Sequence, residues 1–529
     1  MRRYIFLLCL AVGLSLGSTT GQDKSVKQAG EKLSILLSYI DMLYVDPANI
    51  DKLSEAAVRS VLLELDPHSY YLSAEELEEA NEELAGQFEG IGVQFQIHKD
   101  TILVISPITG GPSERVGIMA GDKIVEINGQ NATGPDIDNR FVFDRLRGLA
   151  GTQVKVGIKR GRRDDILNYT ITRAAIPVTT LDAVFMAAPG IGYIRINRFA
   201  QNTMSEFQES LKLLKKEGMK KLILDLRNNS GGYMHAAIDM VDQFMESNKL
   251  IVYTQGYHSP RQDFYSTWLG SFIKGEVVVM IDEGSASASE IVAGAVQDWD
   301  RGIVVGRRSF GKGLVQKQFP LNDGSAVRLT TARYYTPSGR SIQKPYENGQ
   351  EDYFLELAQR FEHGEFVYAD SIRFPDSLRY QTRGGRVVYG GGGIMPDIFV
   401  PWDSTEYTDL YAELIRTGVI NDIVLEYVEE NRSKLKETYP DIHRFKDFVL
   451  PASVISSMRK MADERQVVWS DKEYDLSATL IQSQLKALIA RNLFDISAYF
   501  QVILEEDDAY NHALEALHNK DIWNRVLSQ

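Results

Sequence analysis

Val277-Val-Val-Met-Ile281 is followed closely by Gly284-Ser-Ala-Ser-Ala-Ser-Glu290. Together these two stretches are the strongest indication of the fold class. Five consecutive apolar residues predict a buried strand, and the small residues after them predict a turn. Apolar positions between Ile291 and Val296 then match helical spacing. The segment therefore predicts a strand, a turn and a helix that begins near Ser287, which places a serine hydroxyl at a helix N-terminus.

Strands and helices alternate on both sides of this segment. Apolar runs predict further strands at 192–196, 222–226, 303–305 and 327–334. Helical patterns lie between some of these runs, at 205–216 and 233–245. Such alternation predicts βαβ units, and hence an α/β domain over residues 176–403.

A lysine that follows Ser287 by 25 residues supplies the second half of a candidate catalytic pair. Lys312 lies in Ser309-Phe-Gly-Lys-Gly-Leu-Val-Gln316. A serine hydroxyl is a weak nucleophile near neutral pH, and a neutral lysine amine can take its proton without a histidine. Burial among apolar groups favours the neutral amine. We therefore predict that Ser287 is a nucleophile, that Lys312 is its base and that Gln316 orients the amine.

A glycine turn, Asn228-Asn-Ser-Gly-Gly232, follows the predicted strand 222–226. Unpaired backbone N–H groups in such turns and at helix N-termini carry partial positive charge and stabilise a developing oxyanion. The predicted oxyanion hole consists of the N–H groups of Gly231, Gly232 and Ala288.

These motifs resemble those of the carboxyl-terminal processing peptidases, also called tail-specific proteases. The similarity extends from about residue 30 to about residue 400 and also includes Leu65-Asp-Pro-His-Ser69 and Thr336-Pro-Ser-Gly-Arg-Ser-Ile-Gln343. The resemblance implies a fold like that of the Clp protease and crotonase group. It also selects Ser287 over Ser285 and Ser289, because the family's base lies 25 residues after its nucleophile. Ser230 stands where the family often has proline, and the turn chemistry survives this change.

Residues 87–175 show short alternating strands and glycine turns, including Gly121-Asp-Lys-Ile-Val-Glu-Ile-Asn-Gly129. This pattern resembles a PDZ domain, with Phe88-Glu-Gly-Ile-Gly-Val93 as carboxylate-binding loop and edge strand and a helix at 137–146 as the other wall. PDZ domains bind a peptide C-terminus as an added strand. The predicted peptide-binding residues are Gly90, Ile91, Gly92 and Val93. A purely structural β-domain is the alternative.

Helical periodicity flanks these two domains. It predicts a helical N-terminal module over 23–86 and a helical C-terminal module over 404–529, where no family motif is found. Packing, dimerisation and substrate gating all stay open as roles for the latter. The predicted fold class is thus α/β multidomain: a helical N-terminal module, a PDZ domain, a Clp protease/crotonase-like catalytic domain and a helical C-terminal module.

Residues 1–22 predict a secretory signal peptide, since Arg2 and Arg3 precede an apolar stretch that ends in small and polar residues. A membrane anchor would need about 20 apolar residues, and this stretch is shorter. We expect export to the periplasm or cell envelope of a bacterium. The single cysteine, Cys9, lies within this segment, so the mature chain is expected to have no disulfide and no thiolate metal site.

Composition excludes several classes of function. The formal net charge of −14 over 529 residues argues against nucleic acid as a partner. Eight scattered histidines without an H-E-x-x-H pattern predict neither a metal site nor a cofactor. Gly306-Arg-Arg-Ser-Phe-Gly-Lys312 is close to a phosphate-binding loop, but Gly313 replaces the required Ser or Thr and an alternating strand pattern follows. We therefore do not predict nucleotide binding.

Two functions are compatible with these patterns. The favoured prediction is an exported serine endopeptidase that recognises substrate carboxyl termini through its PDZ domain and hydrolyses peptide bonds through an acyl-enzyme. The alternative is a non-catalytic PDZ peptide-binding scaffold, in which Ser287 only caps a helix within the S-x-x-E capping box that ends at Glu290. Expected partners are unfolded or tail-exposed proteins. Homo-oligomers and a peripheral membrane or adaptor contact are left open.

Overall fold

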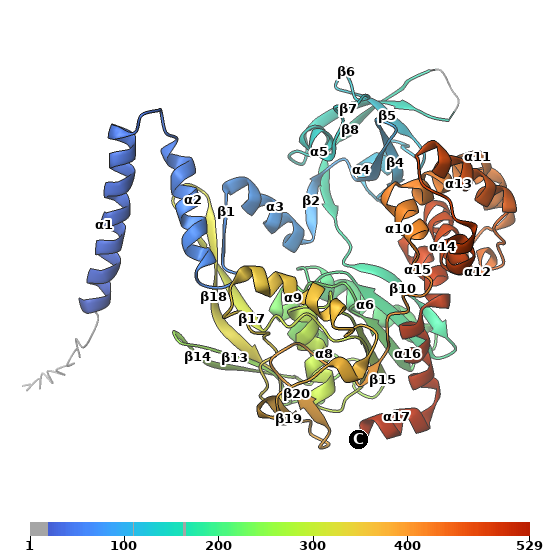
Figure 1. Ribbon diagram of the computed structural model, residues 1–529. Coiled ribbons are helices and arrows are strands. Elements are labelled where there is room, and N and C mark those ends of the chain that lie inside the picture. Colours follow the sequence, from blue (N-terminus) through green and yellow to red (C-terminus); the bar gives the residue numbers. More distant parts are fainter. Residues whose placement is uncertain (1–19, 109, 162–164, 529) are drawn as a thin grey trace, which may run out of the picture. The chain divides into compact units, whose positions relative to one another are not determined.

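The computed structural model describes residues 20–108, 110–161 and 165–528 (Figure 1). The predicted signal peptide, residues 1–22, lies almost entirely outside these residues. The chain divides into two compact units, Met1–Tyr71 and Leu72–Gln529. None of the described helices combines the length and the apolar character needed to span a bilayer.

The first unit contains two helices, α1 (Thr20–Leu43) and α2 (Ile50–Leu63). The Asn49 side chain caps α2 by accepting a hydrogen bond from the Lys52 N–H at 2.9 Å. A short strand, β1 (Tyr70–Leu72), follows. The first helix of the second unit is α3 (Ala74–Ala85), which begins with a capping box between Ser73 and Glu76.

A six-stranded sheet forms the centre of the second unit. Its strands run in the order β10-β11-β12-β15-β16-β21, and all neighbouring pairs are parallel except β10 with β11. The predicted strands at 192–196, 222–226, 277–281 and 303–305 are confirmed here. The bounds are β10 (Leu181–Ala188), β11 (Ile191–Ile196), β12 (Lys221–Asp225), β15 (Glu276–Ile281), β16 (Ile303–Gly306) and β21 (Ile398–Phe399).

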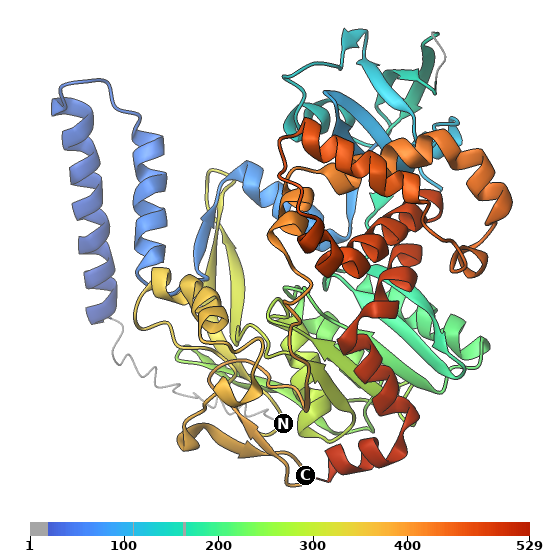
Figure 2. The same ribbon diagram turned by 45° about the vertical axis from the view of Figure 1, so that its right-hand side comes forward.

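Helices cover both faces of this sheet, which explains why its central strands contain runs of apolar residues, such as 222–224 in β12 and 277–281 in β15. On one face, Leu222 and Leu224 pack with α6 (Thr203–Lys216), α7 (Met234–Asp242) and α8 (Ala288–Asp298). On the other face, Ile223 packs with the C-terminal helices. These helices are α15 (Ile496–Ile503), α16 (Asp508–His518) and α17 (Lys520–Leu527), and α16 lies alongside the sheet in Figures 1 and 2. The C-terminal helices therefore complete the core on the second face of the central sheet.

A second, antiparallel set of strands flanks the central sheet. It contains β13 (Leu250–Gly256), β14 (Ser259–Tyr265), β17 (Leu314–Pro320) and β18 (Ala326–Tyr335). The strand predicted at 327–334 is thus confirmed. Because β17 begins two residues after Lys312, the chain beyond this lysine is a strand, in contrast to the helix that a phosphate-binding loop requires.

A segment of mixed structure precedes the last strand of the central sheet. It contains α9 (Gln350–Glu362), β19 (Arg379–Gln381) and β20 (Val387–Tyr389). The glycine-rich segment 390–397 forms a loop, and the strand that closes the central sheet, β21, follows directly after it. Successive glycines disfavour strand structure there.

The PDZ-like region has its own sheet and core. Its strands run in the order β3-β4-β5-β7-β8, so β3 is an edge strand, and α5 (Asn139–Leu146) is the predicted wall helix. Thirteen buried residues, including Ile102, Ile124 and Val156, form the core. The strands are β3 (Val93–His98), β4 (Thr101–Pro107), β5 (Lys123–Ile127), β7 (Gln153–Lys159) and β8 (Leu167–Thr172). The chain enters and leaves through an antiparallel pair, β2 (Gln87–Gly90) and β9 (Ala174–Pro177).

The C-terminal region begins with a bundle that we call the helical module. It consists of α10 (Asp409–Arg416), α11 (Val419–Thr438), α12 (Ile442–Phe445), α13 (Ala452–Glu464) and α14 (Asp471–Leu493). Its buried residues, such as Leu414, Val424 and Leu485, form a separate core.

Candidate active site

Ser287 lies at a sharp turn between β15 and α8. Its backbone angles are φ 53° and ψ −111°, a region that residues with a Cβ rarely adopt. Such strain is found preferentially at functional sites. The Ser287 side chain is partly exposed, whereas Ser285 and Ser289 are fully buried. The latter two hydroxyls donate to the carbonyls of Leu226 and Asn229 at 2.8 and 2.9 Å, and so brace the turn.

The carboxylate of Glu290 connects this turn to the loop that carries Lys312. Its Oε2 atom accepts hydrogen bonds from the N–H groups of Ser287 and Lys312, at 2.8 and 2.9 Å. Its Oε1 atom accepts from the Ser309 hydroxyl at 2.6 Å and from the Gly311 N–H at 2.8 Å. Burial raises the pKa of Glu290, an effect that these four donors oppose. The predicted capping interaction is therefore present and also extends to the lysine loop.

Tyr334 joins the same two residues through their carbonyl groups. Its hydroxyl lies 3.0 Å from the Ser287 carbonyl oxygen and 2.7 Å from that of Lys312. Burial, together with the nearby Glu290 carboxylate, raises the pKa of Tyr334 well above its usual value, so the hydroxyl keeps its proton. The backbones of Ser287 and Lys312 are thus bridged by a carboxylate that accepts from both N–H groups and by one hydroxyl whose proton is shared between both carbonyls.

The structure places Lys312 and Gln316 at the start of one hairpin. Lys312 is partly buried, and the next residue, Gly313, donates its N–H to the Gln343 side chain at 2.8 Å. Gln316 lies on β17, opposite Thr330 of β18. The predicted base and its predicted orienting residue therefore come from one continuous segment.

The glycine turn packs directly against Ser287. A Cβ atom built on Gly231, at φ +105°, would lie 2.7 Å from the Ser287 Cβ and 3.0 Å from the Ala288 nitrogen. One built on Gly232, at φ +140°, would lie 2.0 Å from the Phe199 carbonyl oxygen. Only glycine fits at either position. The three predicted oxyanion residues are thus brought together, but the Gly231 N–H already donates to the Asn229 side chain at 2.9 Å.

Buried charges hold the strand that leads into this turn. Asp225 accepts hydrogen bonds from Tyr193 at 2.7 Å, Arg195 at 2.9 Å and Arg227 at 2.8 Å. Although burial alone would raise the pKa of Asp225, the two arginines hold it far below its usual value. Arg227 also pairs with Asp507, next to α16, at 2.8 Å. Local sequence patterns gave no signal for this network, because its members are far apart in the chain.

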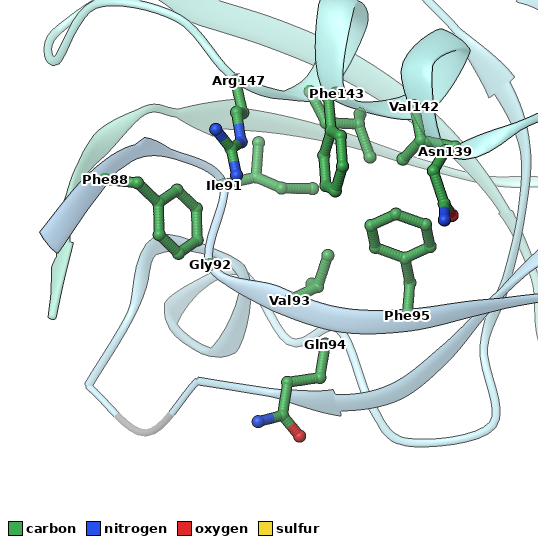
Figure 3. A pocket seen from close by; sticks show the side chains of 11 residues that line it. Phe88, Ile91, Gly92, Val93, Gln94, Phe95, Asn139, Val142, Phe143 and Arg147 are labelled. Atoms are coloured by element: carbon green, nitrogen blue, oxygen red, sulfur yellow. The ribbon is translucent and has the colours of Figure 1, made fainter. Parts of the chain in front are cut away.

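The PDZ-like region contains an open groove of about 370 Å³ between β3 and α5 (Figure 3). Of the predicted peptide-binding residues, Ile91, Gly92 and Val93 line it, whereas Gly90 ends β2 and is not part of the lining. Figure 3 shows Phe95 pointing into the groove and Gln94 pointing away from it. The remaining lining residues are Phe88, Asn139, Val142, Phe143, Leu146 and Arg147. The groove is therefore largely apolar and follows an unpaired strand edge.

Within the described part of the chain, no three His, Cys, Asp or Glu side chains are grouped so that they could hold a metal ion.

Comparison with known proteins identifies the family. The model of peptidase family S41 matches residues 190–349, and a PDZ domain model matches residues 90–171. The carboxy-terminal-processing protease of Bartonella bacilliformis is 35% identical over 344 residues, which is 64% of this chain and 78% of that protein. The chain belongs to the carboxyl-terminal processing peptidases of family S41. It is therefore a serine peptidase with a PDZ domain.

The chain is also similar to other known proteins. The carboxy-terminal processing protease CtpB of Bacillus subtilis is 32% identical over 330 residues, or 62% of this chain and 68% of that protein. A solved structure, the photosystem II D1 C-terminal processing protease, is 30% identical and covers 58% of this chain and 83% of its own, with a TM-score of 0.33. Residues 410–495, within the helical module, match a family model of unknown function.

Tyr334 offers a direct test of how this peptidase holds its site. Tyr334→Phe is expected to lower kcat about tenfold, equivalent to about 1.4 kcal/mol, with little change in KM, because the bridge between the Ser287 and Lys312 carbonyls is lost. Tyr335→Phe is the matched control, since this neighbour instead stacks on Tyr253 with ring centroids 4.7 Å apart. Steady-state kinetics on a peptide substrate would measure both. Equal kcat values for the two variants would contradict a positioning role for Tyr334.

Proposed function

We propose that this protein is an exported serine endopeptidase that captures the carboxyl termini of its substrates and cleaves them with a Ser287–Lys312 dyad. The observation that carries this proposal is the double bridge between these residues: Glu290 binds both of their N–H groups, and Tyr334 binds both of their carbonyls. This double bridge fixes the two backbones relative to each other, as a dyad requires.

The reaction proceeds through an acyl-enzyme. The Ser287 hydroxyl oxygen attacks the substrate carbonyl carbon while the neutral Lys312 amine takes the hydroxyl proton. The resulting ammonium then donates that proton to the leaving amine as the peptide C–N bond breaks. Water next attacks the ester carbonyl carbon and gives one proton to Lys312. The ester C–O bond then breaks, and the Lys312 ammonium returns the proton to the Ser287 oxygen, which restores the hydroxyl and the neutral amine. Gln316 orients the lysine amine.

Backbone N–H groups stabilise the oxyanion in both steps. Ala288 is the first residue of α8, where N–H groups are unpaired within the helix. Gly232 belongs to the turn packed against Ser287. The Gly231 N–H can stabilise the oxyanion only after it gives up its hydrogen bond to the Asn229 side chain and donates to the oxyanion in its place.

The PDZ groove selects the substrate. A peptide tail adds as a strand beside β3, and the backbone N–H groups near Ile91 and Gly92 bind its terminal carboxylate. Because the groove is lined by Val93, Phe95 and Val142, it favours an apolar residue at or near the terminus. Substrates are therefore unfolded or tail-exposed proteins with apolar ends.

The function is tested with one unfolded substrate protein prepared with either a free or an amidated carboxyl terminus. Mass spectrometry is expected to detect internal cleavage of both, with at least tenfold slower cleavage of the amidated form at low substrate concentration. A short peptide without an apolar tail serves as the control for the catalytic step itself. Equal rates for the two forms would refute tail recognition, and no cleavage of any substrate would favour the non-catalytic scaffold.

A further inference from the structure

The helical module, α10 to α14, has a core of its own and matches only a family model of unknown function. One face of its helix α11 carries three acidic residues, Asp422, Glu426 and Glu429. Spacings of four and three residues place them on one side of a helix. Each of the three contacts a basic side chain of the PDZ domain.

One histidine–carboxylate contact and two ion pairs join the two regions. His98 Nδ1 lies 3.0 Å from Asp422 Oδ1, and Lys99 Nζ lies 2.8 Å from Glu426 Oε1. The third pair, Lys123 with Glu429, is longer, at 3.5 Å. Apolar side chains also meet here, since Leu103 and Met119 of the PDZ domain line a cavity of about 210 Å³ together with Leu425 and Val428 of α11. The contact therefore combines charge complementarity with an apolar part.

Asp422 is the centre of this contact. The side chains of His98 and Asp422 are only 12% and 14% exposed, whereas those of Lys99 and Glu426 are 65% and 43% exposed. Solvent-exposed charged pairs add little to the free energy of a contact, so the shielded His98–Asp422 pair contributes more than the exposed Lys99–Glu426 pair. Asp422 also accepts a hydrogen bond from Arg465 at the end of α13, which fixes its carboxylate within the module.

The docked face of the PDZ domain leaves the peptide groove open. No residue that lines the groove also lines the cavity against α11. The two sites share strand β3, however: Val93 and Phe95 lie in the groove, and His98 at the end of the strand binds Asp422. A peptide that adds to β3 therefore binds a strand whose other end is held by the module.

The far end of the C-terminal region is anchored to the catalytic sheet. Helix α14 leads through α15 to α16, which packs on β15 and β16. Asp507, which caps α16, pairs with Arg227 next to the glycine turn. The region thus contacts the PDZ domain at one end and the catalytic sheet at the other.

We propose that the helical module is the intramolecular docking partner of the PDZ domain, and that the acidic face of α11 holds this domain in one orientation while its groove remains open. A PDZ domain held in this way presents a captured tail at high effective concentration to the catalytic domain. This consequence for capture rests on the proposed function, whereas the docking itself does not.

Charge exchange in the full chain tests the docking. Three single variants reverse one charge of the contact each: Asp422→Lys, Lys99→Glu and Glu426→Lys. Each is expected to speed backbone hydrogen exchange at least threefold in residues 93–99 and 419–430. The double variant Lys99→Glu/Glu426→Lys should restore the original rates, because it reverses the pair without removing it. Glu505→Lys, which breaks an exposed pair with Lys446, is the control and should leave these segments unchanged. Unchanged exchange in Asp422→Lys would overturn the docking.

The same variants test the consequence for capture. Asp422→Lys should raise KM for a tailed substrate about threefold to tenfold and leave cleavage of a short untailed peptide within twofold. Faster exchange with an unchanged KM would overturn the role in capture. If the parent protein cleaves no peptide, the proposed function has failed, and hydrogen exchange alone then decides the docking.

Discussion

Ser287→Ala is expected to lower cleavage of an unfolded substrate by roughly 10³-fold or more, because the hydroxyl that we propose as the nucleophile is lost. Neighbouring serines cannot substitute for it, since the hydroxyls of Ser285 and Ser289 are buried and donate to backbone carbonyls. Lys312→Ala should have an effect of similar size. The double variant should be no worse than either single variant, because the two residues act as one unit.

Initial rates on the free-carboxylate substrate, together with covalent labelling by a serine-reactive phosphonate, would measure this effect. Lys317→Ala is the matched control, since Lys317 is an exposed lysine on the same strand, β17. Hydrogen exchange in α8 should be unchanged in all active-site variants, which separates lost chemistry from lost structure. Cleavage by Lys312→Ala at the rate of Lys317→Ala would contradict the dyad.

Arg340→Met is expected to lower the free energy of unfolding of the catalytic domain by about 3–5 kcal/mol, because it leaves a buried carboxylate without its cation. The Arg340 guanidinium donates to Asp298 at 2.8 Å and to Gln297 at 2.7 Å. Neither side chain of the Arg340–Asp298 pair has any exposure. Asp298 also accepts from the Ser338 N–H at 2.9 Å, so the pair ties the end of α8 to the segment after β18.

Hydrogen exchange of the α8 amides reports this loss without requiring two-state unfolding of a multidomain chain. Arg459→Met is the control, because its pair with Asp471 has exposed side chains and should contribute less than about 1 kcal/mol. The double variant Asp298→Leu/Arg340→Met should be less destabilised than Arg340→Met, since no unpaired charge remains. Equal exchange in Arg340→Met and Arg459→Met would refute a structural role for the buried pair.

Local patterns were enough to predict the parts of the site that are close together in the chain. Apolar runs and helical spacing predicted the strand before Ser287 and the helix after it, as β15 and α8 confirm. The glycines of the turn were also recognisable, because positive φ angles and close backbone contacts restrict these positions to glycine. Tyr334 was missed: in the sequence it is one more aromatic residue in a strand, 47 positions from Ser287.

The sequence by itself determined the α/β class, the family and the candidate residues Ser287 and Lys312, because periodicity and motif spacing are properties of short segments. It also indicated that the strand before Ser287 is buried, since residues 277–281 are all apolar. Only the tertiary structure decided that the C-terminal helices cover the second face, that Asp507 reaches Arg227 across 280 positions and that His98 meets Asp422 across 324. Such contacts depend on how whole elements pack, and no local pattern records which distant partner a buried face or charge will find.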